Sequence, residues 1–291
     1  MLIGHQKQWQ FLIKSAELEK LSHLYLFWGE EKLGKKTFAF EFIKWLFKEQ
    51  KISPEKHPDL IFIEPEDVGK EIKINQIRNL IWRLSLKTSL ADYKVGIVDD
   101  AHLMNFQAQN CFLKTLEEPK GKALLILITA YPEKLLPTIL SRVQKIRFFP
   151  LKRKEIEDYL AAQKLKEREE ILIFSSGKPG LMMEFLFQPE KLKKTKKFIL
   201  EIMKIINSDL NFRFQYAKKI SQEFSNPEEI LNIWQRYFRQ ILLKSAMENK
   251  FSTLTYLKLK NMLEAIQNTR SLISDTNVNL KLALENLMLK F

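Results

Sequence analysis

Short runs of consecutive apolar residues alternate, through the first half of the chain, with segments whose apolar residues recur every three or four positions. The runs predict strands at 24–28, 60–63, 94–98 and 124–129, and a last short strand is expected at 145–148. The periodic segments predict helices at 38–46, 75–86 and 105–116. Strands that are apolar throughout and alternate with helices are typical of a parallel sheet covered on both faces. The first half is therefore predicted to be an α/β domain.

The pattern changes after Pro150, where strand-like runs stop. Residues 151–187 predict three short helices interrupted by the Gly177-Lys178-Pro179-Gly180 turn, and the rest of the chain predicts four or five amphipathic helices. We expect three domains, which span residues 1–150, 151–189 and 190–291.

Composition agrees with a helix-rich globular protein. The 291 residues are 45% hydrophobic and 29% charged, which disfavours a disordered chain and a membrane protein. Only 8 are glycine, which disfavours an all-β fold because its many turns need glycine. One cysteine, Cys111, excludes a disulfide framework and a multi-thiolate zinc site, so no zinc is expected. Its register places it in the core.

Nothing in the pattern predicts membrane contact. The first twenty residues alternate apolar and charged positions, unlike a signal peptide, and the longest uncharged apolar stretch, Ala123–Tyr131, is too short for a bilayer. We therefore expect a cytoplasmic protein. The net charge of +13 is compatible with nucleic acid or an acidic partner, although a lysine-rich surface is often simply solvated.

A phosphate-loop frame lies between the first predicted strand and helix, where backbone N–H groups and a helix N-terminus face an anion. Gly29, Gly34 and Lys35 satisfy the pattern GxxxxGK. The next position, normally a hydroxyl that binds Mg²⁺, is Lys36, and Thr37 comes one residue late. The loop is thus either a degenerate nucleotide site or a glycine-punctuated turn.

The third predicted strand ends in two acids, Asp99 and Asp100. Asp99 has the position of a magnesium ligand, and Asp100 stands where an ATPase of this kind carries a glutamate that orients water. The shorter side chain retracts that carboxylate by roughly 1 Å, a misplacement that can cost about a hundredfold in rate. Alternatively, the two acids only cap the following helix.

Together these segments resemble the bacterial clamp-loader AAA+ family of DNA polymerase III. The resemblance covers essentially the whole chain and rests on segments 4–5, 23–29, 99–102, 110–119, 128–129, 136–142 and 279–289, of which LKTLEEP and PTILSR are the most specific. It implies an AAA+ P-loop-type α/β domain over 1–150, a helical lid over 151–189 and a helical oligomerisation collar over 190–291.

Three departures from the family pattern weaken hydrolysis: Lys36, Asp100 and Gly180, the last standing where motor subunits carry a sensor arginine. The resemblance then implies a stator subunit with little or no ATPase of its own and a degenerate site for ATP or ADP with Mg²⁺. One alternative is an active motor ATPase that uses Lys35, Asp99 and Asp100. Another is a stand-alone basic DNA-binding protein of the same fold.

The resemblance also assigns roles outside the loop. Arg142, preceded by Ser141, matches an arginine finger that reaches in trans to a neighbour's ATP, although by itself it reads as a surface arginine. Thr129 matches the sensor position at the end of its strand. The implied partners are motor subunits and a delta subunit in a hetero-pentameric ring, with the sliding clamp and primer-template DNA reached through the complex.

Two further patterns favour packing over chemistry. The four histidines have no paired ligand spacing, so we expect no metal site. Trp234, Tyr237 and Phe238, with two nearby arginines, recur at helical spacing and are predicted to pack in the collar, with base stacking as the alternative. Surplus leucines after residue 250 predict an assembly surface; they are Leu254, Leu257, Leu280, Leu282, Leu284 and Leu287.

Overall fold

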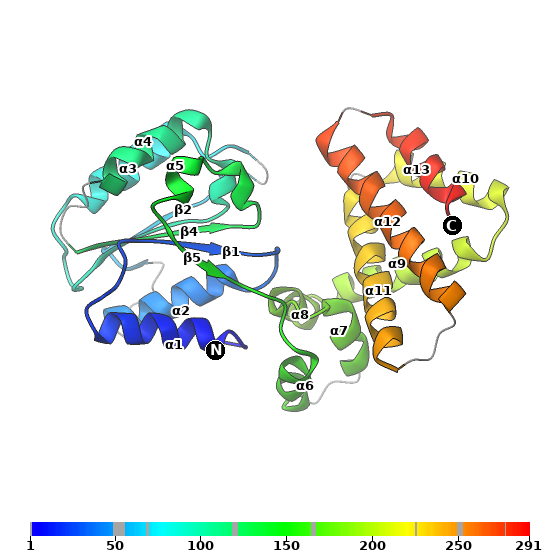
Figure 1. The fold of residues 1–291 in the computed structure, drawn as a ribbon, viewed down its shortest axis with the longest axis horizontal. Helices are drawn as coiled ribbons and strands as arrows, with labels where there is room; N and C mark the ends of the chain where they lie inside the picture. The colour runs from blue at the N-terminus through cyan, green and yellow to red at the C-terminus, as the bar shows by residue number, and fades with distance from the viewer. Residues whose placement is uncertain are drawn as a thin grey trace. The chain divides into compact units, whose positions relative to one another are not determined.

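The computed structural model describes residues 2–48, 56–67, 70–117, 122–163, 167–224, 226–248, 253–276 and 278–291. The chain divides into two compact units, each described here by itself (Figure 1). The first unit consists of Met1–Ala162 with Gly177–Gly180, and the second of Gln163–Ser176 with Leu181–Phe291. The segment expected to form a separate lid is thus shared between the units, and the three-domain division stays a prediction.

The first unit is built on a five-stranded parallel sheet in the order β2-β3-β4-β1-β5. Its strands are β1 Leu24–Trp28, β2 Leu60–Ile63, β3 Lys94–Val98, β4 Ala123–Thr129 and β5 Gln144–Arg147. The predicted parallel sheet is confirmed, and each strand begins within one residue of its expected start.

Helices cover both faces of this sheet (Figure 1). They are α1 Gln6–Glu17 and α2 Lys35–Phe47 on one face, and α3 Ile74–Leu84, α4 Phe106–Glu117 and α5 Pro137–Leu140 on the other. The unit also contains α6 Arg153–Ala161 and the short 3-10 turns η2 Ala101–Leu103 and η3 Pro132–Lys134. On β1, Tyr25 and Phe27 pack with α1 and α2, whereas Leu24 and Leu26 pack with α3 and α4. This alternation follows from the two-residue period of a strand.

The second unit is entirely helical in the part of the chain that the structure describes. It contains α7 Arg168–Ser175, most of α8 Pro179–Phe187, α9 Pro189–Ile206, α10 Leu210–Glu223, α11 Pro227–Glu248, α12 Thr253–Asp275 and α13 Leu280–Leu289. Asp209 and Asn279 cap α10 and α13 by accepting backbone N–H groups, which satisfies donors that a helix start leaves open.

Trp234 on α11 lies at the centre of this helical unit. It is fully buried, stacks on Tyr216 with ring centroids 6.2 Å apart, and donates its indole N–H to the Phe198 carbonyl at 3.0 Å. Phe238 is also buried and Tyr237 packs beside it. The aromatic stripe is therefore core packing, and the base-stacking alternative is wrong for Trp234 and Phe238.

Two smaller expectations can be compared directly. Cys111 is half-buried on α4, less than its register predicted. In the described part of the chain, no helix combines the length and apolar character that crossing a bilayer requires.

Candidate phosphate-loop site

The loop between β1 and α2 depends on its two glycines. Gly29 has a φ of 146°, and a Cβ there would lie 2.4 Å from the Phe148 carbonyl oxygen. Gly34 has a φ of 81° and forms the N-cap of α2. Side chains rarely adopt these positive φ values, so the glycine frame found in the sequence is a structural requirement of this loop.

Lys35, the lysine of the frame, turns back onto its own loop. Its Nζ donates to the carbonyl oxygens of Gly29 and Glu30, both at 2.6 Å, and the residue is only 7% exposed. Burial lowers the pKa of this ammonium to about 8, although the carboxylates of Asp99 and Glu31 act in the opposite direction. The group that would bind phosphate is thus already engaged in hydrogen bonds.

Lys36 occupies the space between the ends of two strands. Its Nζ lies 2.8 Å from Glu64 Oε2, which follows β2, and 3.6 Å from Asp99 Oδ2, which follows β3. It also lies 4.4 Å from the centre of the Phe62 ring. Burial opposes the charge, but the two carboxylates outweigh it and raise the pKa of Lys36. Thr37 is exposed on the first turn of α2.

The two acids after β3 differ from a simple capping pair. Asp99 Oδ1 accepts the Asp100 N–H at 3.1 Å, and Asp100 has a φ of 47° with no side-chain cap bond to η2. Asn105 caps the next helix instead, because its Oδ1 accepts the Ala108 N–H at 2.9 Å. The capping alternative is therefore wrong. Burial raises the pKa of Asp99, and the negative charge of Asp100 adds to this effect.

Thr129, at the end of β4, is buried and joins the loop to the sheet. Its hydroxyl accepts the Tyr131 N–H at 2.9 Å and shares a 3.1 Å hydrogen bond with His102 Nδ1. The Tyr131 hydroxyl in turn donates to Glu31 of the loop at 3.2 Å. Thr129 is thus linked to the loop through Tyr131, a residue that the sequence motifs did not identify.

The glycine turn at residues 177–180 fastens onto the same loop. The Gly180 N–H donates to the Lys32 carbonyl at 2.8 Å, and Lys178 Nζ lies 2.7 Å from Glu30 Oε2. A Cβ on Gly180 would lie only 2.8 Å from the Lys32 oxygen. The close approach of the Lys32 backbone therefore explains why this position is glycine, independently of the arginine that motor subunits carry there.

His5 contacts the end of the loop that leads into α2. Its Nε2 shares a 2.9 Å hydrogen bond with the Leu33 carbonyl, and its ring makes edge contacts with Phe38 and Phe148. Burial lowers the pKa of His5, so the neutral ring is favoured. The segment Gly4-His5 carried the family resemblance, but the contact itself was not predictable from spacing.

Arg142 and Ser141 lie apart from these loop contacts, on the segment between α5 and β5. Both are exposed. Arg142 donates to the Thr138 carbonyl at 3.1 Å and to Ser141 Oγ at 3.3 Å, and Ser141 Oγ donates to Thr138 at 3.0 Å. The structure therefore brings Gly29, Gly34, Lys35, Lys36, Asp99, Asp100 and Thr129 to the carboxyl edge of the sheet, and holds Arg142 against the end of its own helix.

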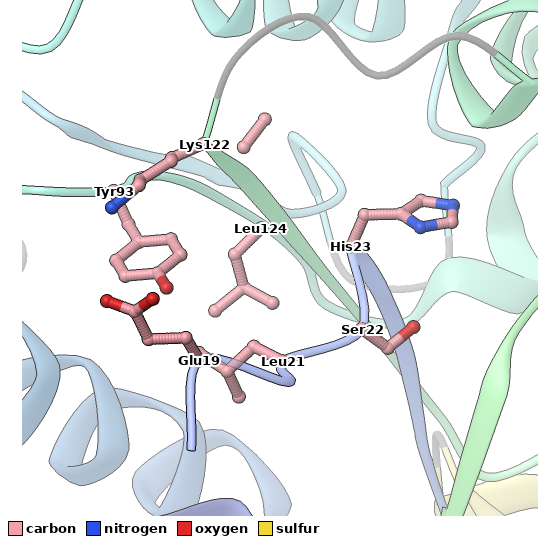
Figure 2. Close-up of a pocket in the computed structure, with 8 residues that line it drawn as sticks. Glu19, Leu21, Ser22, His23, Tyr93, Lys122 and Leu124 are labelled. Atoms are coloured by element: carbon pink, nitrogen blue, oxygen red, sulfur yellow. The ribbon is translucent and has the colours of Figure 1, made fainter. Parts of the chain in front are cut away.

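A cavity of about 250 Å³ lies at the opposite, amino edge of the sheet (Figure 2). It is lined by Glu19, Leu21, Ser22, His23, Tyr93, Lys122, Ala123 and Leu124. In Figure 2 the hydroxyl end of Tyr93 points toward the Glu19 carboxylate. None of the predicted site residues lines this cavity.

The residues at the loop do not fit a magnesium-bound nucleotide. Lys36 stands between the two carboxylates that a metal ion would use, and Lys35 is satisfied by loop carbonyls. In addition, Glu31 brings a carboxylate to the loop, where it would repel a polyphosphate. Among the described residues, no group of three or more His, Cys, Asp or Glu is placed to hold a metal ion.

This sheet order, with a GxxxxGK loop after β1 and an acid after β3, defines a P-loop α/β protein of the AAA+ class. Within that class, residues 4–152 match the family described as "DNA polymerase III, delta subunit", and the chain belongs to that family. The clamp-loader resemblance predicted from the motifs is confirmed.

Named relatives support the same assignment. The chain is 32% identical over 176 residues to the DNA polymerase III subunit delta′ of Pseudomonas aeruginosa, with 54% of each chain covered. It is 38% identical over 168 residues to the delta′ subunit of Bacillus subtilis, with 53% of this chain and 50% of that protein covered. The chain thus spans about half the length of the curated relatives it matches.

A solved structure resembles the fold over nearly its whole length. It is a DNA polymerase III gamma subunit-related protein from Thermotoga maritima, 22% identical, with a TM-score of 0.52 and coverage of 96% of this chain and 97% of that one. This likeness concerns the fold, including the helices that follow the sheet.

Proposed function

We propose that this protein is a stator subunit of a bacterial clamp loader, which assembles with motor subunits and a delta subunit to load the sliding clamp onto primer-template DNA. Its membership of the DNA polymerase III delta family and its similarity to delta′ subunits support this proposal. The proposal places it in the cytoplasm, within a hetero-pentameric ring.

The observation that carries the stator role is the state of the two loop lysines. Lys35 donates to Gly29 and Glu30, and Lys36 pairs with Glu64 and Asp99. A nucleotide would have to break these contacts before it could bind. Each buried hydrogen bond of the Lys35 ammonium is worth about 1.5–3 kcal/mol, whereas the half-exposed Lys36–Glu64 pair contributes less. We therefore expect the isolated chain to hydrolyse ATP very slowly or not at all.

Arg142 is the residue proposed to act on a neighbouring subunit. An exposed guanidinium can stabilise the charge that develops on a transferring phosphoryl group, and such an arginine is typically worth about 10³–10⁵ in rate. Its present hydrogen bonds to Thr138 and Ser141 are surface contacts, which an approaching phosphate can replace at small cost.

The experiment is a reconstituted ring that carries Arg142→Ala. We expect normal assembly, a partial loss of DNA-stimulated ATPase because one site of several loses its finger, and a larger loss of clamp loading. Arg142→Lys should not restore activity, since an ammonium lacks the bidentate fork. Arg153→Ala, another exposed arginine of the same unit, serves as the matched control. Wild-type ATPase and loading in the Arg142→Ala ring would refute the trans role.

The motor alternative is tested on the isolated chain. ATP turnover comparable to that of a motor subunit, abolished by Lys35→Ala, would favour an active ATPase. Absence of turnover, together with assembly into the ring, supports the stator role.

A further inference from the structure

Three separate elements of the first unit meet at the Lys36 ammonium. Its own helix α2 supplies the ammonium, the segment after β2 supplies Glu64, and the segment after β3 supplies Asp99. The Phe62 ring lies 4.4 Å from the same nitrogen. Two carboxylates and an aromatic face together form a site for one cation, and this chain provides that cation itself.

The position of this ammonium has a chemical meaning. In a phosphate loop, the residue after the frame lysine carries a hydroxyl that binds Mg²⁺ together with the acid after the neighbouring strand. Here the residue is Lys36 and the acid is Asp99, and they contact each other directly at 3.6 Å. A divalent ion and an ammonium cannot share this space, because both would compete for the same oxygens and repel each other.

We propose that the Lys36 ammonium occupies the place of the divalent cation of the phosphate loop, so that this site folds without metal and excludes Mg²⁺. The substitution is more than a lost ligand. Removing a hydroxyl alone would leave Asp99 and Glu64 with no cation beside them, whereas the lysine, at 3.6 Å and 2.8 Å from their oxygens, offsets one of the two negative charges from within the chain. This inference concerns the loop alone and stands independently of the trans role of Arg142.

Because Asp99 is largely buried, the Lys36 ammonium interacts with it strongly. The Asp99 side chain is only 18% exposed, so its charge is poorly screened by water and an opposite charge nearby has a strong influence. The carboxylates raise the pKa of Lys36, and the ammonium acts to lower the pKa of Asp99 against the larger effect of burial. Glu64 is more exposed, at 53%, and it contributes mainly by holding the ammonium in position through the 2.8 Å contact.

The test measures metal binding to the full chain with Mn²⁺ as the probe, by the loss of its free electron paramagnetic signal. We expect the wild-type chain to bind no Mn²⁺ at this site at millimolar concentration. Lys36→Thr, which restores the hydroxyl, should create one site. Adding Asp99→Asn to that variant should weaken the site on the order of 10–100-fold, the range seen when a supporting carboxylate is removed.

A matched control comes from the same helix. Lys44 on α2 is exposed, and Lys44→Thr should bind no more Mn²⁺ than the wild type. Thermal unfolding gives a second measurement, since a metal that binds only the folded state raises the midpoint. MgCl₂ should leave the wild-type midpoint equal to that in EDTA, and should raise the midpoint of Lys36→Thr.

A third variant, Lys36→Met, covers the case in which Lys36→Thr does not fold. Methionine keeps an apolar stem against Phe62 and removes the ammonium, so Mn²⁺ should bind to Asp99 and Glu64. Wild-type Mn²⁺ binding that Asp99→Asn abolishes would overturn the proposal. Failure of every folded Lys36 variant to gain a site would also overturn it, because Lys36 would then not be what excludes the metal.

Discussion

Lys35 satisfies the GxxxxGK frame, but its ammonium donates to carbonyl oxygens of its own loop. The frame GxxxxGK identified the residue, and its burial and the two carbonyl acceptors became visible only in the folded loop. The pKa of Lys35 falls to about 8 in the folded chain from an ordinary value of 10.5. Between these values the unfolded chain binds more protons than the folded chain, so folding stability rises with pH in that window.

Replacing Lys35 with methionine should remove this pH dependence. We expect the wild-type chain to gain stability relative to Lys35→Met as the pH rises from about 8 toward 10.5, and to show its full burial penalty below 8. Urea unfolding followed by tryptophan fluorescence measures this, because four of the five tryptophans (Trp9, Trp28, Trp45, Trp82) lie in the first unit. Lys44→Met is the control. A pH-independent difference between wild type and Lys35→Met would contradict the prediction.

At the scale of elements, the sequence was sufficient wherever a local pattern decides the structure. Strands β1 to β4 were predictable because buried parallel strands require nearly continuous apolar runs. Strand β5, at the edge of the sheet, is Gln-Lys-Ile-Arg and buries only Ile146. The loop frame was also predictable from a local pattern. The partner of Lys36 was not, because Glu64 follows β2, and its place beside Asp99 depends on a strand order that no local pattern contains.

The glycine turn is a second contact that local patterns could not predict. Gly180 was interpreted as a missing arginine, whereas the structure shows that its amide bonds to the Lys32 carbonyl and leaves no room for a Cβ. This contact joins residues nearly 150 positions apart in the chain. Because only the folded chain brings them together, a motif comparison shows that glycine stands in place of the arginine but does not show why glycine is required.

Gly180 should therefore tolerate no side chain. We expect Gly180→Ala to cost about 1–3 kcal/mol through overpacking against the Lys32 backbone, and Gly180→Arg to detach the turn and increase hydrogen exchange at the loop. Phe187→Arg, at an exposed position of the same helix α8, is the matched control and should leave both measurements unchanged. Unaltered stability and exchange in Gly180→Ala would show that the turn is not fastened to the loop.

At the scale of the whole molecule, the leucines of the helical unit fall into a buried group and an exposed group. Leu284 and Leu287 are buried in its own core, whereas Leu257 and Leu282 are 49% and 62% exposed. Leu254, which belonged to the same predicted surplus, lies outside the residues whose side chains the structure describes. Leu257 lies near the start of α12 and Leu282 near the start of α13, so they are two separate exposed positions at which contact with another subunit can be tested.

Those exposed leucines give the assembly prediction a sharper test than a truncation, because a single charge on an exposed position leaves the core intact. We expect Leu257→Glu and Leu282→Glu to unfold at the wild-type temperature and to weaken ring assembly, since burying an unpaired carboxylate at an interface is costly. Asn268→Glu, at an exposed polar position of α12, controls for the added charge. Size-exclusion chromatography of each variant with its partner subunits measures the effect. If both leucine variants form full rings as efficiently as the control, then neither position lies at an assembly interface, and the subunit contacts must be sought elsewhere on the molecule.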